Sequence, residues 1–392
     1  MTLHKNIKFI TWFNFFLDFR FYAPVAILYF AEVTGSYALG MSIFSTAMLS
    51  SAVFEVPTGI FSDMIGRKKT IVIGAFATLF SVIFYAIGGV YVALFIGAIF
   101  EGFARSLYSG NNEALLHETL SEGNQQSEYS EFLGRTRSAE QVALAIASVS
   151  GAIIAYWSFS LVMWLSVIPA VLGLLVSFKI VEPKILKSKT TNIYFHLKIA
   201  IKEFRRNKKL RMLSIASILG FAQGESSFQF RSAFIVTLWP IWAIGISKTL
   251  SNIGAALSFY YSGRLIRRFG EYKMVITGRI YALITDIVAV TFPNIFSPVL
   301  LSSNSIFFGV NTVTTSTLKQ REFTKEQRST MGSLISLGRS IAFAIVAFLL
   351  GFVADVIGPA KAYLSVKILA AISLGIYWKL FRGERCLENK VT

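Results

Sequence analysis

The chain has 392 residues, of which 54% are hydrophobic and only 15% are charged, and its mean hydropathy is +0.60. A chain of this length and composition cannot hide its apolar surface in a water-soluble core, so it belongs in a lipid bilayer. The single cysteine, Cys386, excludes an intrachain disulfide and multi-cysteine metal sites, and the three histidines are too scattered to form a cluster.

Twelve apolar segments of the chain are predicted to cross the membrane. A helical span needs about 20 mostly apolar residues, and each segment meets this requirement within a few residues. In chain order the predicted spans cover residues 9–30, 38–60, 70–88, 90–112, 139–157, 161–180, 212–236, 248–266, 274–292, 296–318, 332–352 and 361–381.

The longest hydrophilic stretch lies midway along the chain and divides it into domains. This predicts an N-terminal six-helix bundle at 1–181, a basic cytoplasmic linker at 182–211, and a C-terminal six-helix bundle with a cytoplasmic tail at 212–392. The shorter connection at 117–134 is acidic, and we expect it to be a solvated loop.

The central linker carries a helical pattern of its own. Ile193, Leu197, Ile201 and Phe204 recur at helical spacing, and lysine and arginine side chains occupy the other side. Such a pattern is typical of a helix lying on the anionic inner leaflet of a membrane. A solvated tether is the alternative interpretation.

The formal net charge of +17 is spread over the loops instead of being gathered in a soluble basic domain. Most lysines and arginines lie in the N-terminus, in the connections that follow even-numbered spans, and in the C-terminus. This positive-inside bias predicts that both termini and the basic loops are cytoplasmic, in a cytoplasmic membrane. No basic, aromatic-interleaved patch favours binding to nucleic acid. Eight basic residues lie within spans or near the opposite face: Arg20, Arg105, Arg231, Lys248, Arg279, Arg339, Lys361 and Lys367.

Two stretches 204 residues apart, 59–69 and 263–273, carry the same frame of glycines and basic residues. Each follows one apolar segment and precedes another, so each is predicted to be a tight turn between two membrane helices. Further residues match at the same offset of 204 positions and at equivalent points of the hydropathy pattern, which indicates that the chain consists of two homologous halves. The matching pairs are Gly59 and Gly263, Gly66 and Gly270, Lys69 and Lys273, Gly74 and Gly278, and the dipeptides Gly134-Arg135 and Gly338-Arg339.

The first of these stretches resembles the signature loop of the major facilitator superfamily (MFS). It reads Gly59-x-x-x-Asp63-x-x-Gly66-Arg67-Lys68-Lys69 and falls between the second and third of twelve spans, as in that family. The second stretch occupies the place of the family's degenerate second copy. The resemblance covers essentially the whole chain. It implies an all-α integral membrane protein with 12 transmembrane helices in two pseudo-symmetric six-helix bundles, normally a monomer.

The resemblance also implies a gating role for the loop. Asp63 and Arg67 would latch onto the opposite half of the protein on the cytoplasmic side, while the second copy has Arg267 in place of the acid and cannot make the mirror-image contact. The alternative is a motif that only stabilises the turn and the topology. The signature positions are Gly59, Asp63, Gly66, Arg67 and Lys68 in the first copy and Arg267 in the second.

Two departures from the family pattern bear on the activity. Ala98 stands where the fourth span of the family often has an arginine, four residues before a glycine that corresponds to Gly102. The fifth span, around Gly151, lacks the Gly-Pro pair of the antiporter signature. These departures weaken a proton-relay role in the fourth span and an assignment as a drug antiporter.

Charged side chains inside the spans are functional candidates, because burying one at mid-membrane costs roughly 2.5–3.5 kcal/mol. Glu101 and Arg105 stand four residues apart and can neutralise each other within span four. Asp286 and Arg279 in span nine are predicted to be structural partners. By the family resemblance, spans 1, 4, 7 and 10 line a central cavity. The substrate-cavity candidates are Tyr22, Glu101, Arg105, Gln223, Asn304 and Asn311, with Arg339 in span eleven.

Four carboxylates are candidates for proton coupling. Asp18 in span one and Glu225 in span seven have no obvious partner on their own helix, and the duplication makes these two spans equivalent. A carboxylate that is alternately buried and opened to water can load and release a proton. Glu55 and Glu113 are the next candidates.

These observations predict a secondary active transporter that moves a small organic solute by alternating access, with protons or another ion as the driving species. No nucleophile and base at a common depth, metal-binding cluster or phosphate-binding loop is found, so neither an enzyme, a cofactor protein nor an ATP-driven pump is expected. A non-transporting receptor or scaffold is a remote alternative.

Export of amphipathic or drug-like compounds is favoured slightly over uptake of a polar metabolite such as an amino acid, a sugar or an organic ion. Many apolar side chains and few fixed polar groups favour export. The missing antiporter signature favours uptake, and so does a polar set of Glu101, Arg105 and Gln223 that could hold a zwitterion.

Overall fold

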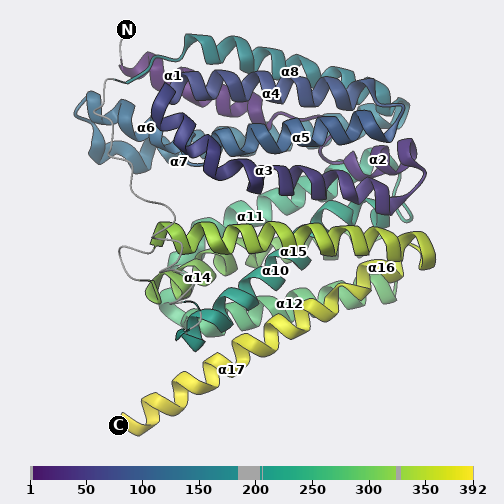
Figure 1. The fold of residues 1–392 in the computed structure, drawn as a ribbon. Helices are drawn as coiled ribbons and strands as arrows, with labels where there is room; N and C mark the ends of the chain where they lie inside the picture. Colours follow the sequence, from purple (N-terminus) through teal and green to yellow (C-terminus); the bar gives the residue numbers. More distant parts are fainter. Residues whose placement is uncertain (1–2, 184–203, 205, 324–327, 392) are drawn as a thin grey trace. The chain divides into compact units, whose positions relative to one another are not determined.

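The computed structural model describes residues 3–183, 204, 206–323 and 328–391, and every regular element in these ranges is a helix. Figure 1 shows their order along the chain. The first half contains α1 (Leu3–Asp18), α2 (Ala26–Thr34), α3 (Tyr37–Ile65), α4 (Arg67–Ile87), α5 (Tyr91–Tyr108), α6 (Asn111–Glu122), η1 (Gln126–Glu128), α7 (Tyr129–Trp157) and α8 (Phe159–Lys179). The second half contains α10 (Lys208–Ile235), α11 (Ile241–Phe269), α12 (Glu271–Thr291), α13 (Ser297–Ser303), η2 (Asn304–Phe307), α14 (Phe308–Arg321), α15 (Arg328–Ile357), α16 (Pro359–Ser365) and α17 (Lys367–Val391).

The chain divides into two compact units. The first unit comprises Met1–Lys189 with Pro240–Thr249, and the second comprises Thr190–Trp239 with Leu250–Thr392. The helix predicted within the central linker falls largely in 184–203, outside the described residues. Phe204, the last residue of that pattern, packs against a small cluster of buried side chains around Leu210 in the second unit.

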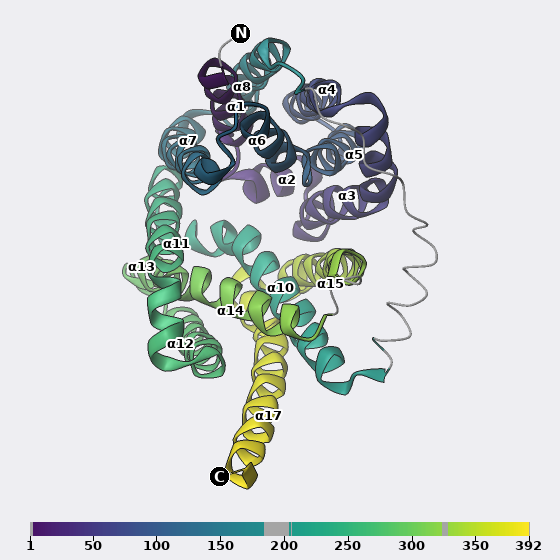
Figure 2. The ribbon, with the colours of Figure 1, turned by 90° about the vertical axis from the view of Figure 1, so that its left-hand side faces the viewer.

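In the first unit, α5 packs along α3 and α4, α8 packs on α4 and α1, and α7 packs on α1 (Figure 2). Small residues permit the closest of these approaches. A Cβ added at Gly102 of α5 would lie only 2.3 Å from the carbonyl oxygen of Ala47 in α3. In the second unit, α10 packs on α15 and α17, and α12 packs on α17 and α14.

The first predicted span is interrupted. It contains α1, which ends at Asp18, and α2, which begins at Ala26, with turns between them. Pro24 explains the break, because proline lacks a backbone N–H donor and disfavours a helical conformation in the residue before it. The tenth predicted span is also divided, into α13, η2 and α14.

By length and composition, eight segments of the described chain could cross a membrane. The predicted first, seventh, eighth and tenth spans are not among them, because their helices are short, as in α1, or carry internal polar side chains, such as Glu225 in α10. A helix with such groups cannot face lipid over its whole surface, so these helices are suited to the protein interior. The eight segments are Tyr37–Glu55, Arg67–Ile87, Tyr91–Glu122, Glu131–Trp157, Phe159–Lys179, Glu271–Thr291, Met331–Ile357 and Pro359–Glu384.

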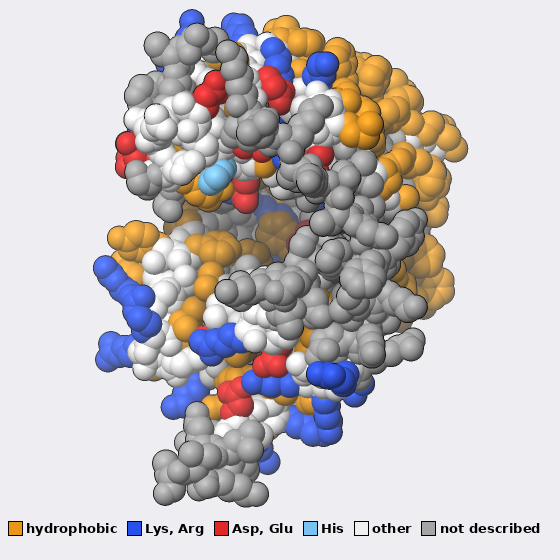
Figure 3. All heavy atoms as spheres, turned by 60° about the vertical axis from the view of Figure 1, so that its left-hand side comes forward, with side chains coloured by type: hydrophobic (Ala, Val, Ile, Leu, Met, Phe, Trp, Pro, Cys, Tyr) orange, Lys and Arg blue, Asp and Glu red, His pale blue; other side chains and the backbone are white. Residues whose placement is uncertain are grey.

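Large apolar side chains stay exposed along the outer helices. On α8, Trp164, Ile168 and Leu175 are 50%, 54% and 53% exposed and recur at helical spacing. In the space-filling view, hydrophobic side chains cover one flank, and lysine and arginine side chains stand at the end that comes forward (Figure 3). Exposed apolar side chains of this kind are what a helix bundle presents to lipid.

The duplicated frame forms the same turn twice, as predicted. Gly66 separates α3 from α4 with φ of 100°, and Gly270 separates α11 from α12 with φ of 84°. Only glycine adopts such values without strain, so each copy joins two long helices through a single residue.

We expect Gly66→Ala to cost about 1–3 kcal/mol, because the alanine would be strained at this φ and its Cβ would lie 2.7 Å from the Glu182 carboxylate. Gly59→Ala is the matched control. It lies inside α3 with no atom within 4 Å of the added Cβ, and alanine is preferred to glycine in a helix. Thermal unfolding of the detergent-solubilised protein, followed by tryptophan fluorescence, should give a lower Tm for the Gly66 variant alone. Equal Tm values would contradict the role of this turn.

Candidate functional site

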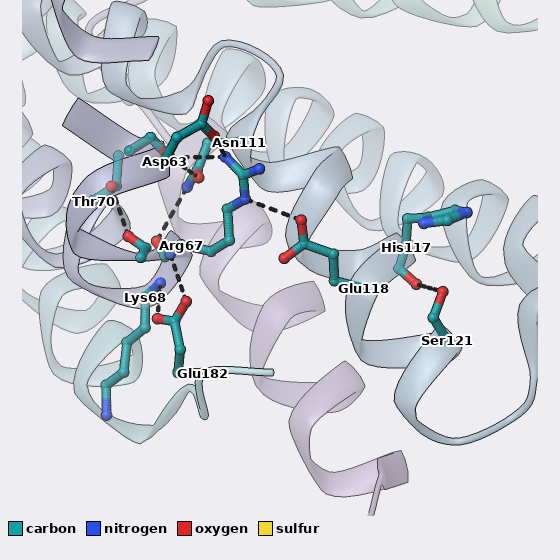
Figure 4. A network of polar contacts seen from close by, with 11 residues as sticks. Asp63, Arg67, Lys68, Thr70, Asn111, His117, Glu118, Ser121 and Glu182 are labelled. Atoms are coloured by element: carbon teal, nitrogen blue, oxygen red, sulfur yellow. Dashed lines mark hydrogen bonds and ion pairs between the residues drawn. The ribbon is translucent and has the colours of Figure 1, made fainter. Parts of the chain in front are cut away.

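The turn between α3 and α4 is the centre of a polar network in the first unit (Figure 4). The Arg67 guanidinium forms ion pairs with Asp63 at 3.0 Å and with Glu118 at 3.2 Å, and it donates a hydrogen bond to the Ser62 hydroxyl at 3.0 Å. Arg67 is only 23% exposed, whereas the Asp63 side chain is 53% exposed. The arginine is therefore fixed from three directions, while the acid is open to solvent.

Glu182 holds the start of α4. Its two carboxylate oxygens accept hydrogen bonds from the backbone N–H groups of Arg67, at 2.6 Å, and Lys68, at 2.7 Å. These N–H groups have no partner within the helix, and a negative charge at this end is also favoured by the helix dipole. Gly66 has no side chain that could do the same. The hydrophilic sequence around Glu182 predicted only a linker residue and carried no signal for this role.

A second helix, α6, is attached to the same turn. The Ser62 hydroxyl donates to the Asn111 side-chain oxygen at 2.7 Å, and the Asn111 amide donates to the Arg67 carbonyl at 3.2 Å. The expectation of a solvated loop at 117–134 is therefore wrong for its first part, which belongs to α6, and for its last part, which belongs to α7. Helix α6 continues to Glu122, because Glu118 finds the basic residue Arg67 across the turn.

The second copy of the turn is built differently. Arg267 is exposed and has no carboxylate within ion-pair distance among the described residues, and Glu271 at the start of α12 supplies the negative charge that Glu182 supplies to α4. Glu271 also forms an ion pair with Arg321 of α14 at 2.7 Å. The two halves share the backbone turn but not its electrostatics.

A buried charge cluster lies inside the first unit. One oxygen of Glu101 binds both Arg105, at 2.7 Å, and Arg20, at 3.1 Å, and the other accepts a hydrogen bond from the Tyr85 hydroxyl at 2.8 Å. Glu101 is 13% exposed. Tyr22 is 5% exposed and packs edge-on against Tyr85, with ring centroids 5.7 Å apart, so it belongs to the apolar core around this cluster.

The spacing of Glu101 and Arg105 predicted a pair within one helix, and Arg20 was not predicted to join them. The break after α1 brings Arg20 into reach, since the chain leaves the helix at Asp18 and the Arg20 Nε donates to the Leu17 carbonyl at 3.0 Å. The cluster therefore joins α5 to the end of α1. Proline at position 24 was the available signal for that break.

The four coupling candidates lie in different surroundings. The half-buried carboxylates of Asp18 and Glu55 make no hydrogen bond or ion pair with any described residue. Glu113 forms an ion pair with Arg137 at 2.6 Å. Glu225 accepts a hydrogen bond from Gln229 on its own helix at 2.8 Å.

In the second unit, Asp286 is held by residues other than Arg279. It binds Lys367 at 2.7 Å and accepts hydrogen bonds from Asn304, at 2.7 Å, and Tyr363, at 3.3 Å. Both members of the ion pair are almost fully buried. The predicted partnership of Asp286 with Arg279 is therefore wrong, because the turn into α17 places Lys367 nearer. Asn304 is committed to this network.

The other cavity candidates of the second unit make contacts between helices or within one. Gln223 donates to Ser227 at 3.1 Å on α10, and Asn311 of α14 lies against Gly278 of α12. Arg339 of α15 donates to the Ser217 hydroxyl of α10. Their predicted contact with substrate stays a prediction.

Comparison with known proteins gives a consistent family. A family model described as Major Facilitator Superfamily matches residues 9–345. An uncharacterized MFS-type transporter of Methanocaldococcus jannaschii is 24% identical over 377 residues, which are 92% of this chain and 94% of that protein. A Na(+), Li(+), K(+)/H(+) antiporter of Planococcus maritimus is 26% identical over 173 residues, which are 42% of this chain and 40% of the antiporter.

Solved structures show the same fold. A mutant of the nucleoside transporter NupG superposes with a TM-score of 0.85 at 13% identity, over 97% of this chain and 100% of that chain. A bacterial homolog of the human lysosomal transporter Spinster, inward-facing and unoccupied, gives a TM-score of 0.76 at 12% identity over 97% of both chains. These likenesses confirm the predicted all-α membrane fold of 12 transmembrane helices in two pseudo-symmetric six-helix bundles.

The cluster around Glu101 predicts unequal effects of substitution. Glu101→Gln leaves two arginines without their carboxylate and should cost roughly 3–5 kcal/mol, since it uncovers buried charge. Arg105→Gln keeps the Arg20–Glu101 pair and removes a 42% exposed side chain, so it should cost at most about 1 kcal/mol. Tm measurements in detergent compare the two.

Multiple substitutions test whether Arg20 is a full member of the cluster. The double variant of Glu101 and Arg105 still leaves Arg20 unpaired, so it should stay destabilised, and adding Arg20→Gln should restore part of the loss. Full recovery in the double variant would show that Arg20 is independent of the pair.

Proposed function

Because this chain belongs to the major facilitator superfamily, a family of membrane transporters, we propose that it is a proton-coupled secondary transporter that moves a small organic solute by alternating access. Export of amphipathic compounds is the favoured direction. The protein is a multi-pass membrane protein, and the proposal places it in the cytoplasmic membrane as a monomer with both termini in the cytoplasm.

The observation that carries the proposal is the state of Asp18. Its half-buried carboxylate stands at the end of α1 without a hydrogen bond or ion pair to any described residue, within electrostatic range of Arg20, Arg105 and Arg137. A carboxylate fixed in an ion pair cannot easily exchange its proton, but one without such a partner can be loaded and unloaded. Glu113 and Glu225 are weaker candidates, because each already has a partner.

The relatives support coupling to protons in general terms. The Planococcus maritimus protein is named as an exchanger of Na+, Li+ or K+ for H+, and it is similar to this chain over 173 residues. An exchanger of this kind draws its energy from an ion gradient. An ion gradient is also the expected energy source for a chain whose sequence has no nucleotide-binding loop.

The polar contacts favour an amphipathic solute over a strongly polar one. Glu101 and Asn304, predicted as cavity groups, already have partners inside their own units. Fewer fixed polar groups are then left to hold a sugar or an amino acid, while apolar and aromatic side chains are abundant. Uptake of a polar metabolite is the second candidate function, and the 42% exposed guanidinium of Arg105 favours it because it could contact a carboxylate.

The distribution of charge supports the orientation. The α3–α4 turn carries Arg67, Lys68 and Lys69, and the start of α10 carries Lys208, Lys209 and Arg211. Basic residues at membrane ends are retained in the cytoplasm. The proposal therefore places the Gly66 turn and the linker on the cytoplasmic side.

Proton coupling is tested with Asp18→Asn. We would test tetraphenylphosphonium, ethidium, amino acids and sugars one by one in sealed vesicles with an imposed pH gradient. The transported solute is the one whose movement elicits a proton flux. Asp18→Asn should then lower gradient-driven transport at least roughly tenfold and preserve solute exchange without a gradient, because binding survives the loss of the proton site. Glu131→Gln, in an exposed pair with Arg135, is the matched control and should behave as wild type. Normal gradient-driven accumulation by Asp18→Asn would contradict the assignment of Asp18 as the coupling carboxylate, and Glu55 would be tested next.

The gating role of the signature loop has its own test. Asp63 is exposed, so its carboxylate is available to the opposite half in another conformation, and Asp63→Asn should favour the inward-open state and slow transport. Arg267→Gln, the equivalent position of the second copy, should do less. Cysteines placed on the cytoplasmic side report opening through their labelling rate. An unchanged labelling rate in Asp63→Asn contradicts the latch.

A further inference from the structure

Three basic side chains of the second unit converge on one turn of α10. The Lys319 ammonium of α14 donates to the Ser217 hydroxyl at 3.2 Å, and the Arg339 guanidinium of α15 donates to the same oxygen. Arg279 of α12 lies one helical turn along, where its guanidinium nitrogens are 2.5 and 2.6 Å from the position of a Cβ added at Gly220. Glycine at position 220 makes room for this arginine.

None of the three cations is paired with an acid among the described residues. The acids nearest in sequence to Arg279 and Lys319 have other partners, since Asp286 binds Lys367 and Glu322 binds Lys209. Like charges are therefore neighbours, and Lys319 and Arg339 repel each other across Ser217. A membrane bundle normally pairs its interior charges, so this excess of positive charge needs an explanation.

Aromatic rings compensate only part of that charge. The Arg279 guanidinium lies 4.8 Å from the centre of the Tyr377 ring, and the Arg339 guanidinium lies 5.4 Å from that of Phe221. The Nε–H groups of both arginines are buried without a hydrogen-bond partner, and Lys319 is only 8% exposed. Each cation thus keeps donor capacity or charge that nothing described in the chain satisfies.

We propose that Arg279, Lys319 and Arg339 form a binding site for a phosphate group inside the second unit. A tetrahedral dianion matches three convergent cations, because arginine forks contact two of its oxygens at once and lysine adds a point charge. The Ser217 hydroxyl, which now accepts from two of the cations, can rotate to donate to the anion. Free phosphate, a phosphorylated solute and the phosphate of an anionic lipid share this chemistry.

The site is separate from the coupling carboxylate. All its residues belong to the second unit, whereas Asp18 belongs to the first. Binding of phosphate can therefore be measured without transport, and its failure leaves the proton-coupling proposal untouched.

The experiment measures thermal unfolding of the full-length protein in a neutral detergent. Inorganic phosphate is titrated against chloride at constant ionic strength, and in a second arm phosphatidic acid is titrated against phosphatidylcholine. A saturable rise in Tm is expected in at least one arm, because a ligand that binds only the folded state stabilises it. A rise with inorganic phosphate identifies a site for free or solute phosphate, and a rise with phosphatidic acid alone identifies a lipid site. No saturable rise in either arm overturns the proposal.

Variants connect the effect to the three cations. Arg279→Gln and Arg339→Gln should each raise the half-saturating concentration at least roughly tenfold, since each loses a charged two-point contact. Arg339→Lys keeps the charge but not the forked guanidinium, so its half-saturating concentration should lie between those of the wild type and Arg339→Gln. It is the variant to measure if a glutamine variant does not fold. Lys273→Gln, an exposed position of α12, is the matched control and should bind as wild type. An equal half-saturating concentration in all of these variants would show that the anion binds elsewhere and would overturn the proposed site.

Discussion

The structure depends on the cost of leaving charge or a backbone polar group without a partner inside a bilayer. Hydrocarbon offers no hydrogen bonds, so each peptide group must be bonded within its own helix. The described chain accordingly consists of helices joined by short turns. Where the helical pattern stops inside a predicted span, as between α1 and α2 and at η2, side chains of the same unit gather beside the break.

The two units meet this constraint in different ways. In the first, Glu101 is shared by Arg20 and Arg105, so an acid on α5 stabilises the chain just after α1. In the second, Asp286 and Lys367 form a buried pair with Asn304 and Tyr363 around it, while Arg279, Lys319 and Arg339 have no acidic partner among the described residues. Because the two homologous halves neutralise their buried charges differently, we expect them to have different functions. We therefore propose proton exchange in the first half and anion recognition in the second.

The duplicated turn shows how far homology constrains a structure. Gly66 and Gly270 keep the same positive φ, because a one-residue connection between two helices demands it. The charges around them have diverged: α4 is capped by the distant Glu182, whereas α12 begins with its own Glu271. Backbone geometry is preserved where no other residue fits, and side-chain chemistry is free to change once the turn exists.

The sequence by itself determined the membrane class, the twelve spans, the duplication and both glycine turns. These features follow from local composition and from backbone conformations that only glycine allows. Tertiary structure decided the partners of the charges. The contact of Arg20 with Glu101, that of Glu182 with the start of α4, and that of Lys367 with Asp286 each join residues between 81 and 115 positions apart. Hydropathy and helical spacing carry no information about which distant helix will lie alongside, so such pairs are visible only once the helices are packed.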